Sequence, residues 1–303
     1  MKIMILLLTL LFLFVGLNYR QLYSIWAVWS ESKRLVDLAK NAAEEFQNPA
    51  PLEDRFEENL SSDFWKFTII NGGGEVSNES AWHSATMAFE DGLTIQHFPD
   101  PAFNDENPDP THKPAAGQYN NVTLISRSVF HPTPSGDVVL KFTSLASEQF
   151  YGSAGVVFQP VGTLQENGFF VKPFDMFGFA VIGEESSFLG FNGPLCYLAL
   201  NWAPVHVVPV NVKVQTWHTY ELRLRWISNT EWLGILKVDD TLMCQMPLPA
   251  FGPVEIHAWS DNYLLTHRPR HWWEIAPSME LKFQDGGDKQ FHLGKIQISA
   301  EAR

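Results

Sequence analysis

Hydrophobic and polar residues alternate most clearly in residues 220–226, where Tyr, two Leu and Trp are separated by one Glu and two Arg. A period of two is typical of a β-strand with one buried and one solvated face. Two further runs of this kind, 234–238 and 241–246, follow. Asp239 and Asp240 between them predict a two-residue turn, because Asp tolerates a positive φ angle. The sequence therefore predicts a three-stranded antiparallel meander.

Short strand-like runs, separated by Gly, Pro, Asn and Asp, continue through residues 58–303. Asp91-Gly92 is the strongest short hairpin signal among them. Further strands are predicted at 64–70, 86–90, 93–97, 122–130, 137–143, 154–159, 168–172, 177–182, 195–201, 205–214, 253–259, 279–284 and 291–299. No segment after Pro51 has a helical period, and no repeat of fixed length occurs. These features predict an all-β domain, a two-sheet antiparallel β-sandwich of the jelly-roll type, over residues 58–303.

The N-terminal segment, residues 1–18, has a different pattern. Lys2 precedes a run, 3–17, that is apolar apart from one Thr and one Gly. At about 1.5 Å per residue this run spans roughly 22 Å, which is less than the roughly 30 Å of a bilayer's hydrocarbon core. A cleaved signal peptide and an uncleaved signal anchor both fit, and the lack of a small-residue cleavage site favours the anchor. Either reading predicts a domain that is membrane-anchored outside the cytoplasm, or secreted.

Residues 19–47 have apolar positions spaced by three and four, which predicts an amphipathic helix next to the membrane. This helix could lie on the membrane, act as a stalk or pack on the domain. Pro49 and Pro51 end the pattern, since proline blocks helix continuation. Residues 48–57 are therefore predicted to be a linker.

Composition narrows the classes of partner. The formal net charge of −13 disfavours nucleic acids and anionic membrane surfaces. Only two cysteines are present, Cys196 and Cys244, which excludes a disulfide-rich scaffold. They can form one disulfide bond or remain as buried thiols.

Metal-binding patterns are sparse. The ten histidines include no HExxH or HxH pattern, so no zinc site is predicted. The long acidic loop 99–118 contains Asp105 and Asp109, whose oxygens are ligands of the kind that calcium takes. A solvated loop fits the same residues. No other cofactor is expected.

Aromatic residues carry the main functional signal, with 11 Trp in the chain. Sugar rings pack their C–H faces on indole rings, so Trp beside polar side chains is typical of a glycan site. In the predicted strand 253–259, Glu255, His257 and Trp259 share one face. The predicted carbohydrate-binding residues are His257, Trp259, Asp261, Asn262, Trp272, Trp273 and, secondarily, Trp202. Packing of these Trp residues in the core is the competing interpretation.

Several motifs together resemble one superfamily. They are Phe64-Trp65, Trp82, EDGLTI at 90–95, WHTYEL at 217–222, the hairpin at 234–239 and FHLGKIQI at 291–298. This set resembles the concanavalin A-like lectin/glucanase superfamily, which includes laminin G-like modules and family 16 glycoside hydrolases. The resemblance implies a lectin-type β-sandwich whose partner is a glycan or polysaccharide.

The catalytic pattern of family 16 is absent from the chain. Those hydrolases resemble one another in an E-x-D-x-x-E or E-x-D-x-E strand, which sets two carboxylates about 5 Å apart. No two carboxylates stand two residues apart in this sequence. Carboxylates from different strands would have to converge, and the candidates are Glu255, Asp261, Glu274 and Glu280. The sequence thus favours carbohydrate binding without catalysis, with two alternatives open: a glycoside hydrolase or lyase with unusual carboxylate placement, and a protein-binding adhesion domain.

Overall fold

The computed structural model describes most of the chain after residue 45. The described residues are 46–71, 74–76, 85–97, 120–146, 152–161, 164–166, 169–171, 176–183, 193–200, 203–228, 231–249, 253–261, 263–268, 278–283 and 289–303. Within these ranges the chain forms the β-strands β1 to β20, and all their pairings are antiparallel.

Sheet A contains the predicted meander. Its strand order is β16-β15-β14-β7-β20-β5-β4, and β1 pairs with β20. Its strands are β1 (Leu52–Asp54), β4 (Ala85–Phe89), β5 (Leu93–His97), β7 (Gly136–Ala146), β14 (His218–Ser228), β15 (Glu231–Val238), β16 (Thr241–Pro249) and β20 (Lys289–Ala302).

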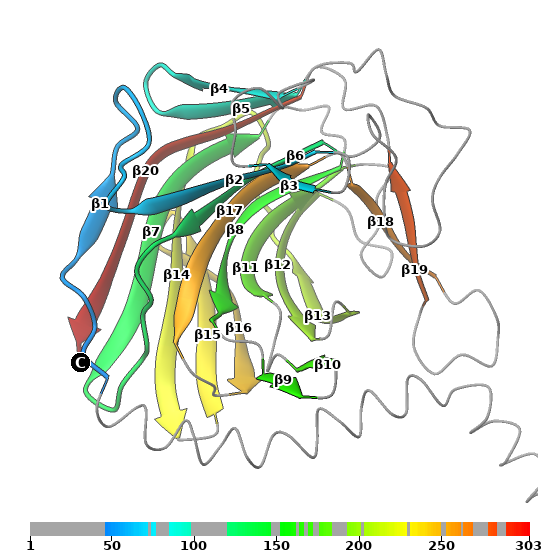
Figure 1. The fold of residues 1–303 in the computed structure, drawn as a ribbon. Helices are drawn as coiled ribbons and strands as arrows, with labels where there is room; N and C mark the ends of the chain where they lie inside the picture. Colours follow the sequence, from blue (N-terminus) through cyan, green and yellow to red (C-terminus); the bar gives the residue numbers. More distant parts are fainter. Residues whose placement is uncertain are drawn as a thin grey trace, which may run out of the picture.

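Sheet B faces sheet A and has the order β13-β12-β11-β8-β17-β6-β2-β3. Its strands are β2 (Trp65–Asn71), β3 (Gly74–Val76), β6 (Asn120–Ser126), β8 (Ser153–Pro160), β11 (Met176–Ile182), β12 (Gly193–Leu200), β13 (Ala203–Pro209) and β17 (Val254–Asp261). Two small sheets pair β9 (Leu164–Glu166) with β10 (Phe169–Val171), and β18 (Tyr263–Arg268) with β19 (Ser278–Phe283). Figure 1 shows the two large sheets curving together as two layers.

The main core lies between the sheets. Alternate residues of β14 point into it, so Tyr220, Leu222 and Leu224 are buried. Across the core, the Phe177 ring of β11 packs against Gly234 of β15, where a Cβ atom would lie 2.6 Å from Phe177 Cζ. The glycine therefore provides the space for a large ring, and the two sheets approach closely at this point. The predicted all-β, two-sheet antiparallel sandwich is confirmed.

A disulfide bond joins the two layers. Cys196 of β12 in sheet B is bonded to Cys244 of β16 in sheet A. Both strands lie near the same edge of the sandwich, where β13 and β16 end the two sheets. The bond therefore ties one edge of sheet B to the facing edge of sheet A.

The two turns that the sequence predicts, at Asp239-Asp240 and Asp91-Gly92, are present in the structure. Asp239 and Asp240 link β15 to β16 with φ angles of 48° and 64°. Asp91 and Gly92 link β4 to β5 with φ angles of 55° and 123°. A side chain at Gly92 would also meet the backbone of Leu293, so glycine is needed there for both reasons.

Part of the predicted linker, residues 48–57, packs on the sandwich. Its residues Leu52–Asp54 form β1, which pairs with β20. Phe56 is fully buried. Asp54 accepts hydrogen bonds from the backbone N–H of Phe56 at 2.8 Å and from Trp65 Nε1 at 2.8 Å. This segment belongs to the sandwich because these long-range contacts outweigh the turn signal of the prolines.

Asn48 is also docked on the sandwich. Its amide donates to the carbonyl oxygen of His131 and accepts from the N–H of His131, both at 2.8 Å. The His131 imidazole is fully buried, edge-on to Trp232 at 5.2 Å between ring centroids and 5.5 Å from the ring of Phe46. Burial lowers the pKa of His131.

The predicted signal anchor, residues 1–18, and nearly all of the predicted amphipathic helix, 19–47, lie outside the described residues. A search of the described residues finds no helix of the length and apolar character that a bilayer-spanning segment requires.

Candidate functional site

The predicted glycan-binding strand is β17, which lies within sheet B between β8 and β6. Its burial alternates along the strand. Val254, Ile256 and Ala258 enter the core between the sheets. Their neighbours Glu255, His257 and Trp259 therefore point to the outer face of sheet B, and each is half-buried.

Glu255 and His257 form a pair on this outer face. His257 Nε2 lies 2.7 Å from Glu255 Oε1, and the two side chains are 15% and 17% exposed. A carboxylate beside an imidazole offers both hydrogen-bond acceptors and a donor at one place. Sugar hydroxyls, which both donate and accept, suit such a pair.

The Trp259 indole is held by a short chain of hydrogen bonds to β8. Its Nε1 donates to Ser153 Oγ at 3.0 Å. Ser153 in turn donates to Asp261 Oδ1, through Oγ at 2.9 Å and through its backbone N–H at 3.2 Å. Asp261 was predicted to contact the ligand, but it is only 8% exposed. Its carboxylate accepts these hydrogen bonds from Ser153, the strand partner of Asp261 on β8.

Gly155 makes room for the indole. It pairs directly with Trp259 across β8 and β17. A Cβ atom at Gly155 would lie 2.7 Å from Trp259 Cη2 and 2.9 Å from Cζ3. The benzo ring therefore lies over the glycine, and its orientation is fixed by this contact and by Ser153. The sequence predicts a strand at 154–159 but gives no signal for Ser153 and Gly155 as site residues, because both reach Trp259 only through the pairing of β8 with β17.

A second hydrophobic cluster lies on the same outer face. It consists of Val157, Ala180, Ile182, Leu195 and Tyr197, with Met176, Val207 and Trp259 packed against it. The five central residues are buried, whereas Trp259 keeps part of its surface. The described part of the site thus combines an indole ring at the margin of an apolar cluster with a carboxylate–imidazole pair next to it.

The two candidate carboxylates on β17 do not form a glycosidase pair. Glu255 and Asp261 are six residues apart on one strand, which places their Cα atoms about 20 Å apart at about 3.3 Å per residue. Glycosidases need their two carboxyl groups within about 5–9.5 Å. Glu280 lies on β19, where it pairs with Thr266 of β18, and its side chain lies outside the described residues.

Several predicted site residues lie outside the described residues: Asn262, Trp272, Trp273, Glu274, Trp202, Asp105 and Asp109. The calcium prediction for the acidic loop falls on them. In the part of the chain that the structure does describe, no three His, Cys, Asp or Glu residues gather in a way that could hold a metal ion.

Comparison with known proteins finds likeness in structure only. No family model and no curated protein matches the sequence. An endo-1,3-beta-glucanase from Streptomyces sioyaensis is similar with a TM-score of 0.49 and 10% identity, covering 85% of this chain and 100% of that one. A family 16 glycosyl hydrolase from Mycobacterium smegmatis has a TM-score of 0.48 and 9% identity, covering 82% of this chain and 99% of that one. The carbohydrate recognition domain of Emp46p has a TM-score of 0.40 and 11% identity, covering 77% of this chain and 97% of that one.

These solved structures include two glycoside hydrolases and a carbohydrate recognition domain. The two antiparallel sheets fit a concanavalin A-like sandwich. Because all three TM-scores are below 0.5, any functional conclusion has to rest on this chain's own residues.

Proposed function

We propose that this protein is a carbohydrate-binding β-sandwich that holds a glycan on the outer face of sheet B, along β17. The observation that carries the proposal is the Trp259 indole, fixed over Gly155 and tied to Ser153 at 3.0 Å. A sugar ring would pack its C–H face on this indole, and its hydroxyls would reach the Glu255–His257 pair.

Preorganisation favours this role. The indole already occupies one orientation, so binding a sugar costs little additional side-chain entropy. The neighbouring carboxylate and imidazole contact each other at 2.7 Å and remain partly exposed. A ligand can therefore exchange hydrogen bonds with the pair without burying an unpaired charge.

The proposed location is outside the cytoplasm. The apolar run of residues 3–17 supports export and attachment to the membrane through the N-terminal segment. The Cys196–Cys244 bond agrees with an oxidising compartment, where disulfides persist.

The test is a glycan array with the full chain, followed by titration calorimetry of the best ligand. Trp259→Ala should weaken binding at least about tenfold, since the stacking surface is lost. Trp217→Ala is the matched control, because Trp217 is 47% exposed but belongs to the loop before β14 of sheet A. Equal affinity of wild type and Trp259→Ala for every bound glycan would refute the proposal.

The same preparation distinguishes the two alternatives. Release of reducing ends from the bound polysaccharide, abolished by Glu255→Gln, would make the protein a glycoside hydrolase. Absence of glycan binding together with specific capture of one protein partner would instead identify an adhesion domain.

A further inference from the structure

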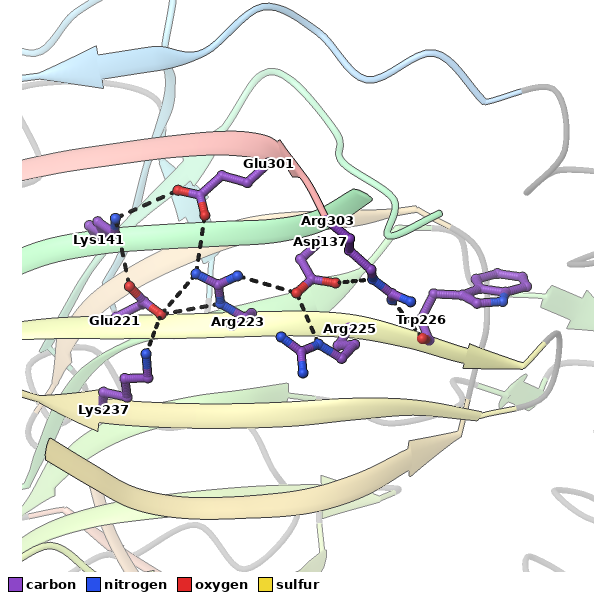
Figure 2. A network of polar contacts seen from close by, with 9 residues as sticks. All are labelled: Asp137, Lys141, Glu221, Arg223, Arg225, Trp226, Lys237, Glu301 and Arg303. Carbon is purple, nitrogen blue, oxygen red and sulfur yellow. Dashed lines mark hydrogen bonds and ion pairs between the residues drawn. The ribbon is translucent and has the colours of Figure 1, made fainter. Parts of the chain in front are cut away.

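A group of charged side chains covers part of the outer face of sheet A, on the side of the sandwich away from the proposed glycan site. We call it the charged face. It consists of Asp137 and Lys141 of β7, Glu221, Arg223 and Arg225 of β14, Lys237 of β15, Glu301 of β20 and the adjoining Arg303. Figure 2 shows these residues linked across the neighbouring strands.

Asp137 is the centre of one half of the network. Its carboxylate accepts hydrogen bonds from Arg303 Nε at 2.8 Å, Arg225 Nε at 3.0 Å and Arg223 Nη1 at 3.2 Å. Arg303 also donates through Nη2 to the carbonyl oxygen of Trp226 at 2.6 Å. Three guanidinium groups therefore share one carboxylate.

Glu221 is the centre of the other half. Its carboxylate contacts Arg223 Nη2 at 3.1 Å, Lys237 Nζ at 3.4 Å and Lys141 Nζ at 3.6 Å. Glu301 contacts Arg223 at 3.1 Å and Lys141 at 3.6 Å. Positive groups again outnumber the carboxylates.

The most exposed side chains of the network are cations, and two of its three carboxylates are more deeply buried, while Glu301 is 36% exposed. The side chains of Lys141, Arg225 and Lys237 are 47%, 41% and 37% exposed. The carboxylates at the two centres, Asp137 and Glu221, are 1% and 14% exposed. The network therefore presents cations to the solvent and keeps most of its negative charge beneath them.

The surplus of positive charge stands out against the rest of the chain. Five cations meet three carboxylates on the charged face, which gives it a net charge of +2 in a chain whose net charge is −13. Arg225 donates to Asp137 through Nε (Figure 2), and its side chain is 41% exposed. An exposed guanidinium group suits bidentate contact with a carboxylate or sulfate group.

We infer that the charged face binds a polyanionic polysaccharide, a glycan chain bearing carboxylate or sulfate groups. A protein partner is disfavoured, because the cores of protein–protein interfaces are depleted of charged residues. On the charged face the charges lie at the centre, and the exposed apolar side chains lie at its edges. Leu242, 54% exposed, pairs with Lys237, and Ile227, 51% exposed, follows Arg225 by two residues on β14. The apolar groups thus flank the charges instead of forming a centre.

Screening disfavours an anionic membrane surface. Charges interact over a Debye length of about 8–10 Å at physiological salt. A single polysaccharide strand stays within that distance of the charged face alone. A flat bilayer would also approach the remainder of a chain that carries a net charge of −13, and the repulsion would offset the local attraction.

The test is affinity electrophoresis of the full chain in gels containing alginate, a polyuronate, or a heparin-type sulfated polysaccharide. Wild type should be retarded, and retardation should fall steeply as salt rises. The double variant Arg225→Ala/Lys237→Ala should bind about tenfold more weakly with a shallower salt dependence, since two exposed cations are lost. Lys213→Ala is the matched control, because it removes one exposed lysine outside the charged face and should bind as wild type does.

Three results would overturn the inference: no retardation of wild type, equal retardation of wild type and the double variant, or binding to polyglutamate or phosphatidylserine vesicles as strong as that to the polysaccharides. Circular dichroism of the double variant checks its folding, and Asp137 keeps Arg223 and Arg303 as partners in it. Trp259 is intact in every variant, so failure here is distinguishable from failure of the sheet B site.

Discussion

The bond between Cys196 and Cys244 makes a quantitative prediction about stability. The two cysteines are 48 residues apart in sequence and connect β12 of sheet B to β16 of sheet A. In the chain-entropy description, a crosslink that closes a loop of this length removes about 14 cal/mol/K from the unfolded chain, which is about 4 kcal/mol at 25 °C. The double variant Cys196→Ala/Cys244→Ala is therefore expected to lose up to about 4 kcal/mol of unfolding free energy.

The assay is thermal unfolding monitored by calorimetry, with and without a reductant. For a domain of about 250 residues, each kcal/mol shifts the midpoint by about 2–4 °C, so the double variant should unfold about 8–16 °C earlier. Reductant should lower the wild-type midpoint by a similar amount and leave the double variant unchanged. The variant thus serves as the control for non-specific effects of the reductant.

A wild-type midpoint that does not respond when thiol titration shows complete reduction would refute this reasoning. Two titratable thiols in the untreated, denatured wild-type protein would refute the bond itself.

Three further predictions concern single side chains. Burial lowers the pKa of His131, so the unfolded chain takes up that proton first as the pH falls below about 6.5, and wild-type stability should decrease on acidification. His131→Phe should flatten the curve of unfolding free energy against pH, because it removes the buried imidazole. Gly155→Ala should cost about 1–3 kcal/mol of unfolding free energy in denaturant titrations, because its Cβ would lie 2.7 Å from Trp259 Cη2. Adding Trp259→Ala should recover only part of this loss, since the new Cβ would still clash with the backbone oxygen of Phe179. Burial raises the pKa of Asp137, but hydrogen bonds from three arginines outweigh this effect and bring the pKa below its usual value. Asp137→Asn should therefore cost about 2–4 kcal/mol of unfolding free energy at pH 7. The difference in stability from wild type should narrow below about pH 4, where the wild-type carboxylate becomes protonated.

The local sequence pattern was sufficient to predict the three-stranded meander and its turn at Asp239-Asp240. Alternation in β14 reports which face is buried, and Asp239-Asp240 reports a turn, because both depend on neighbouring residues alone. The three residues of β1 carry no such signal. Their strand exists only because Leu52 and its neighbours pair with Ile298 and its neighbours at the other end of the chain, and sequence spacing does not show this.

The candidate site shows the same division. The period of two placed Glu255, His257 and Trp259 on one face, as the structure has them. It gave no indication of Ser153 and Gly155, which reach Trp259 only through the pairing of β8 with β17.

The charged face also depends on long-range pairing. Alternation predicted a solvated side of β14 bearing one Glu and two Arg. Their partner Asp137 lies 86 residues from Arg223 in the chain, so its role follows from the sheet order and not from spacing.

The central claim is that a glycan binds over Trp259, and a crystal structure of the chain with the best ligand from the array tests it most directly. The proposal predicts a sugar ring packed on the indole at about 4 Å, with a hydroxyl in hydrogen-bond contact with Glu255 or His257. A glycan bound elsewhere, with the indole of Trp259 free of any sugar contact, would contradict it.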